Sequence, residues 1–182
     1  MEELKLVRPS VEHKRQYEEM MEEWEGFGGR LNPGALRRYS HKQQRNATYE
    51  EWLQWIEDDR QAGQDLYFFM KGSAILGAIS IRLRCAEVDG HSGYGIRPSQ
   101  RRKGYAAMML SMALPVMKER RIDPVIITCA KDNIGSAKTI LRNGGVYIKD
   151  AADGEGETVE IYHIHMENSV SDRGDGIGRG DG

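Results

Sequence analysis

The segment 101–106, Arg-Arg-Lys-Gly-Tyr-Ala, gathers three positive charges immediately before a glycine. An apolar stripe with helical spacing follows, and it predicts a helix over residues 103–120. The first amides of a helix lack partners within the helix and carry a partial positive charge, so they attract anions. Gly104 has no side chain that would keep a phosphate away from the backbone. The segment therefore predicts a phosphate-binding loop.

The elements around this loop narrow the type of phosphate site. An apolar strand over 92–97 ends at Pro98, and the helix is followed by a buried strand over 124–129. A strand, a helix and a second strand in this order predict a parallel crossover. The Gly-x-Gly-x-x-Gly pattern of dinucleotide-binding folds and the Gly-Lys-Ser/Thr of the Walker loop are both absent from the sequence.

Cysteine and histidine offer little further chemistry. Cys85 and Cys129 are the only cysteines, and their spacing matches no zinc pattern. Cys129 ends an apolar strand, a position that favours a buried, inert thiol over a nucleophile. His163 and His165 share one face of a predicted strand but lack clear partners for a metal ion. The sequence therefore predicts no metal site.

Two amphipathic helices are predicted before the main sheet. The first carries an apolar face between Tyr17 and Trp24, and the second begins with a capping box of Thr48 and Glu51. Between them, residues 26–46 lose periodicity and predict a long loop. Its basic side chains either lie on a solvated surface or meet an acidic group of a substrate: Arg30, Arg37, Arg38, His41, Lys42 and Arg45.

Strand patterns fill most of the remaining chain. After a first strand over 4–8, runs at 66–70 and 79–83 predict a hairpin with one solvated face. Two final strands are predicted at 146–149 and 158–166, and a preceding helix ends at Gly144. The last residues, 168–182, are poor in apolar side chains and predict a disordered tail rich in Gly and Asp.

Length and charge bound the class of protein. The 182 residues suit one domain, and 26 Lys and Arg against 28 Asp and Glu give no net field that would attract nucleic acid or an anionic membrane. The sequence begins without a signal peptide, and no apolar stretch approaches roughly 18 residues. We therefore expect a cytoplasmic protein that binds neither nucleic acid nor a membrane.

The segment 93–106 resembles the acetyl-coenzyme A motif of the GNAT N-acetyltransferase superfamily, whose signature is Arg/Gln-x-x-Gly-x-Gly/Ala. A second landmark, Asp132-Asn133-Ile134-Gly135-Ser136, opens the helix that ends at Gly144. The resemblance implies an α/β (α+β) GNAT fold over 1–167, with a mixed central sheet of about seven strands flanked by four helices. It also implies that the strands 92–97 and 125–129 splay apart where the coenzyme enters.

The resemblance further assigns residues to acetyl-coenzyme A, the only cofactor that it implies. The backbone at Ile96 would bind the pantetheine arm, while Asn133 and Ser136 would face the thioester end. The amides of the loop would hold the pyrophosphate, namely those of Arg101, Arg102, Lys103, Gly104, Tyr105 and Ala106.

The positions where many relatives keep catalytic groups hold other residues in this chain. Gly90 and Ser92 occupy the positions of the usual Glu or His base, and Ile140 occupies that of the usual Tyr acid. Three nearby residues are candidates in their place, the first two as bases acting through a water or a strand bulge and the third as an acid: Asp89, His91 and Tyr162.

These features predict an N-acetyltransferase that passes an acetyl group directly from acetyl-coenzyme A to a primary amine of a small molecule or peptide. If the basic loop faces the site, the acceptor also carries a carboxylate or phosphate. The absent base and acid leave open an acetyl-coenzyme A-binding regulatory module without turnover. A homodimer is compatible with the sequence.

Overall fold

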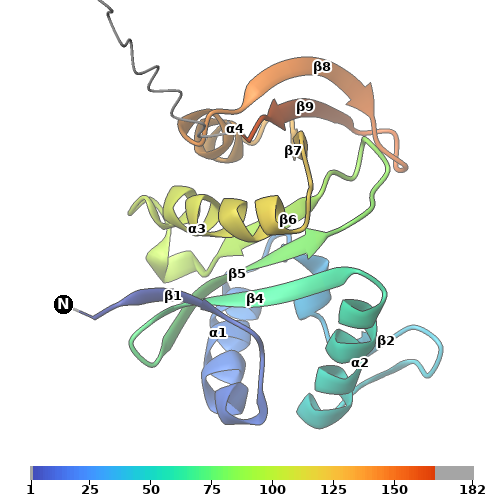
Figure 1. Ribbon diagram of the computed structural model, residues 1–182. Coiled ribbons are helices and arrows are strands. Elements are labelled where there is room, and N and C mark those ends of the chain that lie inside the picture. The colour runs from blue at the N-terminus through green and yellow to red at the C-terminus, as the bar shows by residue number, and fades with distance from the viewer. Residues whose placement is uncertain (1, 167–182) are drawn as a thin grey trace, which may run out of the picture.

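The protein is described by a computed structural model that covers residues 2–166, so the predicted tail over 168–182 lies outside the described residues. Two sheets form its centre (Figure 1). The first is antiparallel and contains, in spatial order, β1 (Leu4–Val7), β4 (Gln64–Lys71), β5 (Ala74–Arg82) and β6 (Ser92–Ile96). The second is also antiparallel and contains β7 (Val125–Ala130), β9 (Thr158–Ile164) and β8 (Val146–Ala152).

Within residues 2–166, backbone hydrogen bonding between the two sheets occurs at the start of β6. No ladder joins β6 to β7 in the described residues, where β7 is an edge strand that pairs only with β9. The amide of His91, just before β6, donates to the carbonyl oxygen of Ile126 in β7 at 2.7 Å. Beyond that bond the two strands separate, in agreement with the predicted splay, and the expected parallel pairing does not form.

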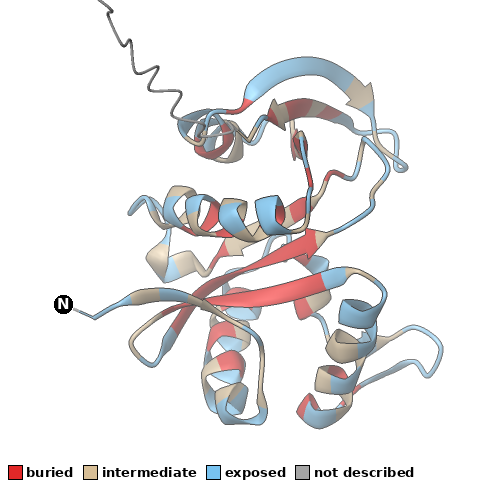
Figure 2. Ribbon diagram, in the orientation of Figure 1, coloured by how far each residue is buried: buried red, intermediate tan, exposed pale blue. Residues whose placement is uncertain are grey.

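Helices cover both faces of the four-stranded sheet (Figures 1 and 2). The helices α1 (Lys14–Phe27) and α2 (Tyr49–Gln61) pack on one face, and α3 (Tyr105–Glu119) packs on the other. The prediction of a hairpin with one solvated face is therefore wrong. Ser80 in β5 is buried, and its hydroxyl is satisfied by the backbone of Gly93 rather than by water.

The segment between α1 and α2 is more ordered than the predicted long loop. It contains a 3₁₀ turn, η2 (Gly34–Leu36), and a short hairpin of β2 (Tyr39–Ser40) and β3 (Arg45–Asn46). The predicted capping box at the start of α2 is confirmed. The amide of Glu51 donates to Thr48 Oγ1 at 3.1 Å, and the amide of Thr48 donates to Glu51 Oε2 at 2.7 Å.

The helix α4 (Ile134–Arg142) lies against α3 and β7. Asn133 caps it, because Asn133 Oδ1 accepts from the amide of Ser136 at 3.0 Å. The left-handed backbone predicted at Gly144 is confirmed, with a φ of 81°. Within residues 2–166, no helix is both long and apolar enough to cross a membrane.

Candidate active site

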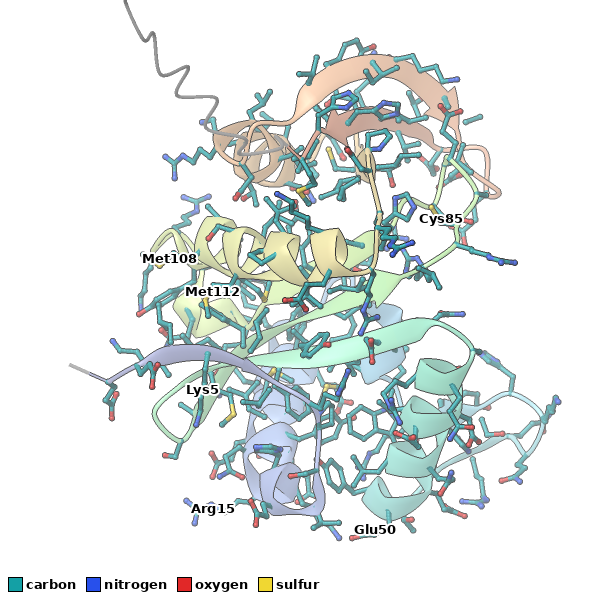
Figure 3. The ribbon with its side chains drawn as sticks, viewed as in Figure 1. Lys5, Arg15, Glu50, Cys85, Met108 and Met112 are labelled. Carbon is teal, nitrogen blue, oxygen red and sulfur yellow. The ribbon has the colours of Figure 1, made fainter. Side chains whose placement is uncertain are left out.

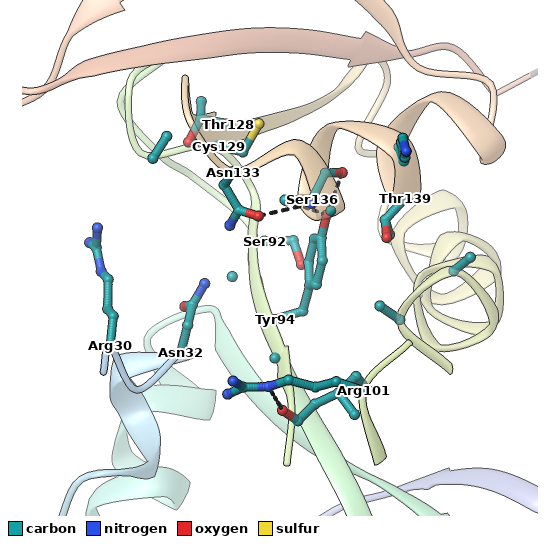
Figure 4. Close-up of a pocket in the computed structure, with 18 of the residues that line it drawn as sticks. Arg30, Asn32, Ser92, Tyr94, Arg101, Thr128, Cys129, Asn133, Ser136 and Thr139 are labelled. Atoms are coloured by element: carbon teal, nitrogen blue, oxygen red, sulfur yellow. Dashed lines mark hydrogen bonds between the residues drawn. The ribbon is translucent and has the colours of Figure 1, made fainter. Parts of the chain in front are cut away.

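A cavity of about 1090 Å³ opens where β6 and β7 separate (Figure 4). Most of its walls come from four parts of the chain that the fold brings together. These are β6 with the following loop and the start of α3, the end of β7, α4 with its cap, and the segment 30–34 after α1. The remaining lining residues lie in α1, in β5 and the loop that follows it, and between β8 and β9 or in β9 itself. The splay therefore provides a space between the two sheets that side chains do not fill.

The predicted phosphate-binding loop lines this cavity with free amides. Arg102 and Gly104 have left-handed backbones, with φ values of 60° and 80°. The amides of residues 102–107 donate to no other described group, and the first to do so in α3 is that of Met108, which donates to the Gly104 carbonyl at 3.2 Å. A Cβ added at Gly104 would meet nothing within 4 Å, so the space above it is open. Such a row of free amides suits an anion.

The charge of the lining also favours an anionic ligand. Two carboxylates line the cavity, from Asp89 and Asp153. Six basic side chains oppose them: Arg30, Arg82, Arg101, Arg102, Lys138 and Arg142. Of the predicted loop residues, only Lys103 does not line the cavity, because its ammonium group donates to Gln100 Oε1 at 3.1 Å.

The Arg101 side chain points back toward α1. Its Nε donates to the carbonyl oxygen of Ile96 at 2.9 Å, and its guanidinium lies 5.4 Å from the ring centre of Trp24 and 5.0 Å from that of Phe27 (Figure 4). Arg101 thus ties the loop to the end of β6. Ile96 lines the cavity, with its carbonyl oxygen already occupied by Arg101.

Two hydroxyl groups meet at the α4 side of the cavity. Tyr94 Oη and Ser136 Oγ lie 2.8 Å apart, and both residues line the cavity together with Asn133 (Figure 4). Burial raises the pKa of Tyr94 to about 12, so it stays protonated at neutral pH. The sequence analysis does not single out Tyr94 as a site residue. It lies two residues after Ser92 and two before Ile96, so all three share one face of β6.

The three candidate catalytic residues do not lie together. Asp89 lines the cavity, and its carbonyl oxygen accepts from Arg82 Nη2 at 2.9 Å. His91 does not line it, and its Nδ1 accepts from the amide of Ile126 at 3.0 Å. Tyr162 does not line it either, and its hydroxyl donates to Glu160 Oε2 at 2.7 Å.

The cysteines also lie apart. Cys129 lines the cavity, and burial raises its pKa to about 11, which keeps it a neutral thiol at ordinary pH. Cys85 lies in the loop between β5 and β6 and does not line the cavity (Figure 3). Within residues 2–166, no three His, Cys, Asp or Glu side chains form a group suited to a metal ion.

Two buried polar atoms in the cavity wall have no hydrogen-bond partner among the described residues. They are Trp24 Nε1 and Ser92 Oγ, and each side chain belongs to a residue that is only 3% exposed. Trp24 comes from α1 and Ser92 from the start of β6. A buried polar group without a partner costs about 1–3 kcal/mol, so these two atoms are unsatisfied positions in the cavity wall.

Comparison with known proteins agrees with this geometry. A microcin C7 self-immunity acetyltransferase, MccE, solved with acetyl-CoA and AMP, is 18% identical, with a TM-score of 0.65 over 90% of this chain and 93% of its own. RimL, a ribosomal L7/L12 α-N-protein acetyltransferase solved with coenzyme A, is 16% identical, with a TM-score of 0.67 over 90% and 94%.

An acetyltransferase from Salmonella typhimurium, which modifies the N-terminal serine of L7/L12, is 16% identical, with a TM-score of 0.67 over 90% of this chain and 95% of its own. No curated protein matches the sequence significantly. The family model described as an acetyltransferase (GNAT) domain matches residues 4–146, more than half of the chain. The sheet divided at β6 and β7 is thus the GNAT fold, and the chain belongs to the GNAT acetyltransferase family.

Proposed function

We propose that the protein transfers an acetyl group from acetyl-coenzyme A directly to a primary amine of a small molecule or peptide. The observation that carries this proposal is the row of free amides at residues 102–107, inside a cavity that opens between β6 and β7. The structural relatives MccE and RimL were solved with acetyl-CoA and with coenzyme A, respectively. The open space above Gly104 fits a pyrophosphate close to the backbone.

In this proposal the loop amides from Arg102 to Ala106 hold the pyrophosphate, while the amide of Arg101, also predicted for this role, donates to the carbonyl oxygen of Pro98 at 3.3 Å. Lys103 contributes its amide there, while its side chain is bonded to Gln100. The pantetheine arm runs along β6 past Ile96, and the thioester lies near Asn133 and Ser136, which line the far part of the cavity. Acetyl-coenzyme A supplies the activated acetyl group.

The acceptor amine must be neutral to attack the thioester. For an amine with a pKa near 10.4, deprotonation at pH 7 costs about 4.6 kcal/mol, so a base helps. Of Asp89, His91 and Tyr162, only Asp89 lines the cavity, and we assign it to receive the amine proton through a water. The nitrogen forms a bond to the acetyl carbon, the carbon–sulfur bond breaks, and the leaving thiolate takes a proton from the hydroxyl pair of Tyr94 and Ser136.

Release of free thiol from acetyl-coenzyme A, followed with a panel of primary amines, tests the activity. We expect amine-dependent release, and we expect Asp89→Asn to lower kcat roughly a hundredfold while the coenzyme affinity stays unchanged. A loss confined to coenzyme affinity would contradict the role of Asp89.

A coenzyme-binding regulatory module is the second candidate. It is favoured by the commitment of His91 to Ile126 and of Tyr162 to Glu160, which leaves fewer side chains free for proton transfer. Tight binding of acetyl-coenzyme A without thiol release for any amine would support this module over the transferase.

A further inference from the structure

The segment 30–34 lies directly against β6. A Cβ added at Gly95 would lie 2.2 Å from the carbonyl oxygen of Asn32 and 2.8 Å from Trp24 Cη2, and one at Gly93 would lie 2.8 Å from Asn32 Oδ1. At Gly95 the nearest atom is a main-chain oxygen, so only glycine fits there, whereas at Gly93 the nearest atom is the end of the movable Asn32 side chain. Gly95 therefore allows the end of α1 and this segment to lie directly against β6 at the cavity wall.

Two positive side chains reach this wall without a carboxylate partner. Arg30 forms no hydrogen bond or ion pair with any described residue, and it points into the cavity beside Asn32 (Figure 4). Arg101 donates only through Nε, so its terminal nitrogens have no hydrogen-bond partner among residues 2–166. The nearby carboxylate of Glu23 is already bound by Arg97 at 2.7 Å and by the amide of Ser99 at 2.7 Å.

A neutral donor lies in the same wall. Trp24 Nε1 is buried without a partner in the described part of the chain, and the guanidinium of Arg101 lies over its ring. The two carboxylates that line the cavity come from elsewhere, Asp89 from before β6 and Asp153 from after β8. This wall thus presents donors and positive charge with no acceptor to satisfy them.

We propose that Trp24, Arg30, Asn32 and Arg101 form a subsite for an acidic group, a carboxylate or a phosphate, on the acceptor. This rests on the proposed acetyl transfer and adds a class of substrate to it, namely primary amines that carry an acidic group. Charge-assisted hydrogen bonds from guanidinium groups bind both kinds of acid well, and the indole N–H adds a fixed direction.

Matched amines test the subsite. Acetyl transfer is measured for 3-aminopropanoate against 3-aminopropanamide, and for O-phosphoethanolamine against ethanolamine, and the two pairs distinguish carboxylate from phosphate. We expect kcat/KM to be about tenfold or more higher for the acidic member of at least one pair, mainly through a lower KM. Equal values within both pairs would overturn the proposal.

Variants locate the preference. The ratio of kcat/KM for the acidic amine to that for its neutral counterpart should fall in both variants. We expect a fall of about tenfold in Arg30→Gln and of about threefold in Trp24→Phe. Arg37→Gln, just after η2 and outside the cavity, and Trp55→Phe, on α2, are controls expected to keep the wild-type ratio. An unchanged ratio in Arg30→Gln would also overturn the proposal.

Binding measurements separate this subsite from the proposed function. Calorimetric titration of the same amines into protein saturated with coenzyme A gives the preference without turnover. Tighter binding of the acidic amine, lost in Arg30→Gln, supports the subsite even if no thiol is released. Thiol release with no acid preference in either measurement overturns the subsite and leaves the transferase intact.

Discussion

At the scale of single residues, Gly104 combines a left-handed backbone with open space above it, because its φ is 80° and a Cβ there would meet nothing within 4 Å. We predict that Gly104→Ala weakens acetyl-coenzyme A binding at least tenfold, measured by calorimetry. The methyl group would occupy the place of a phosphate oxygen and displace charge-assisted bonds worth about 1.5–3 kcal/mol each.

Gly156 provides the matched control for this change. Its φ is 83°, a Cβ there would also meet nothing within 4 Å, and it lies in the turn between β8 and β9, outside the cavity. Both alanine variants carry a similar backbone strain of about 1 kcal/mol. Equal coenzyme affinities in the two variants would contradict the role of Gly104.

Tyr94 has a hydroxyl that stays protonated over the usual range of assays. We predict that Tyr94→Phe lowers kcat about a hundredfold and leaves the affinity for acetyl-coenzyme A unchanged, because only the departing thiolate needs the proton. Since the pKa of Tyr94 is raised to about 12, this group should cause no loss of rate in the wild type up to about pH 10. If Tyr94→Phe left kcat unchanged, the proton on the departing thiol would have to come from another donor.

The sequence indicates the loop residues as a candidate coenzyme site because the pattern depends on residue type and on a helix start, both of which are local. It did not identify Trp24 Nε1 or Tyr94 as site atoms. Trp24 belongs to an apolar helix face that predicts core packing, whereas in the structure its ring lies against Gly95 and the residue lines the cavity. Such directions depend on contacts between distant segments.

At the scale of elements, His91 fixes the point from which β6 and β7 diverge. Its Nδ1 accepts from the amide of Ile126, so protonation of the ring removes the acceptor. Burial, with Arg82 and His163 nearby, lowers the pKa of His91. A pKa lowered in the folded state means that this contribution to stability is complete above the unfolded value of about 6.5 and is lost as the pH falls below it.

We therefore predict that His91→Ala loses the stability supplied by this hydrogen bond, at most about 1 kcal/mol at a half-exposed ring. Its free energy of unfolding should also fall less than that of the wild type between about pH 7 and pH 5. His91→Asn, which keeps an acceptor near the position of Nδ1, should retain more stability at pH 7. Denaturant unfolding at both pH values measures this, and parallel losses in the wild type and His91→Ala would argue against it.

The hairpin of β4 and β5 illustrates why some elements resist prediction. The alternation of Ile79 and Ile81 with Ser80 and Arg82 indicates one solvated face, yet both faces are covered by helices. Ser80 is tolerated inside because its hydroxyl both donates to and accepts from the backbone of Gly93. A polar side chain in a strand thus either faces solvent or forms a hydrogen bond inside the protein, and the sequence alone does not distinguish the two cases.

At the scale of the whole molecule, a ligand in the cavity contacts both sheets, which are otherwise joined near the cavity by the bonds between His91 and Ile126. We predict that acetyl-coenzyme A at a hundred times its Kd stabilises the protein by about 2.7 kcal/mol and raises Tm by roughly 5–10 °C. A thermal-shift titration measures this.

The shift at a fixed coenzyme concentration should shrink in high salt, because the lining carries six basic groups against two acidic ones and salt screens their attraction. The same rise in Tm with inorganic phosphate at equal concentration would show that only the anion, and not the coenzyme, is recognised.

The contact of the segment 30–34 with Gly93 and Gly95 has a consequence for how such an enzyme can diversify. The main-chain oxygen of Asn32 is the atom closest to a Cβ built at Gly95, so the contact of this segment with β6 depends on its backbone and on the absence of a side chain at Gly95. The side chain at position 30 can then change without disturbing the contact between the segment 30–34 and β6. If the proposed subsite binds the acceptor, changes confined to position 30 should alter the choice of acceptor and leave the affinity for acetyl-coenzyme A unchanged, because the loop 101–106 belongs to another part of the chain, some 70 residues later.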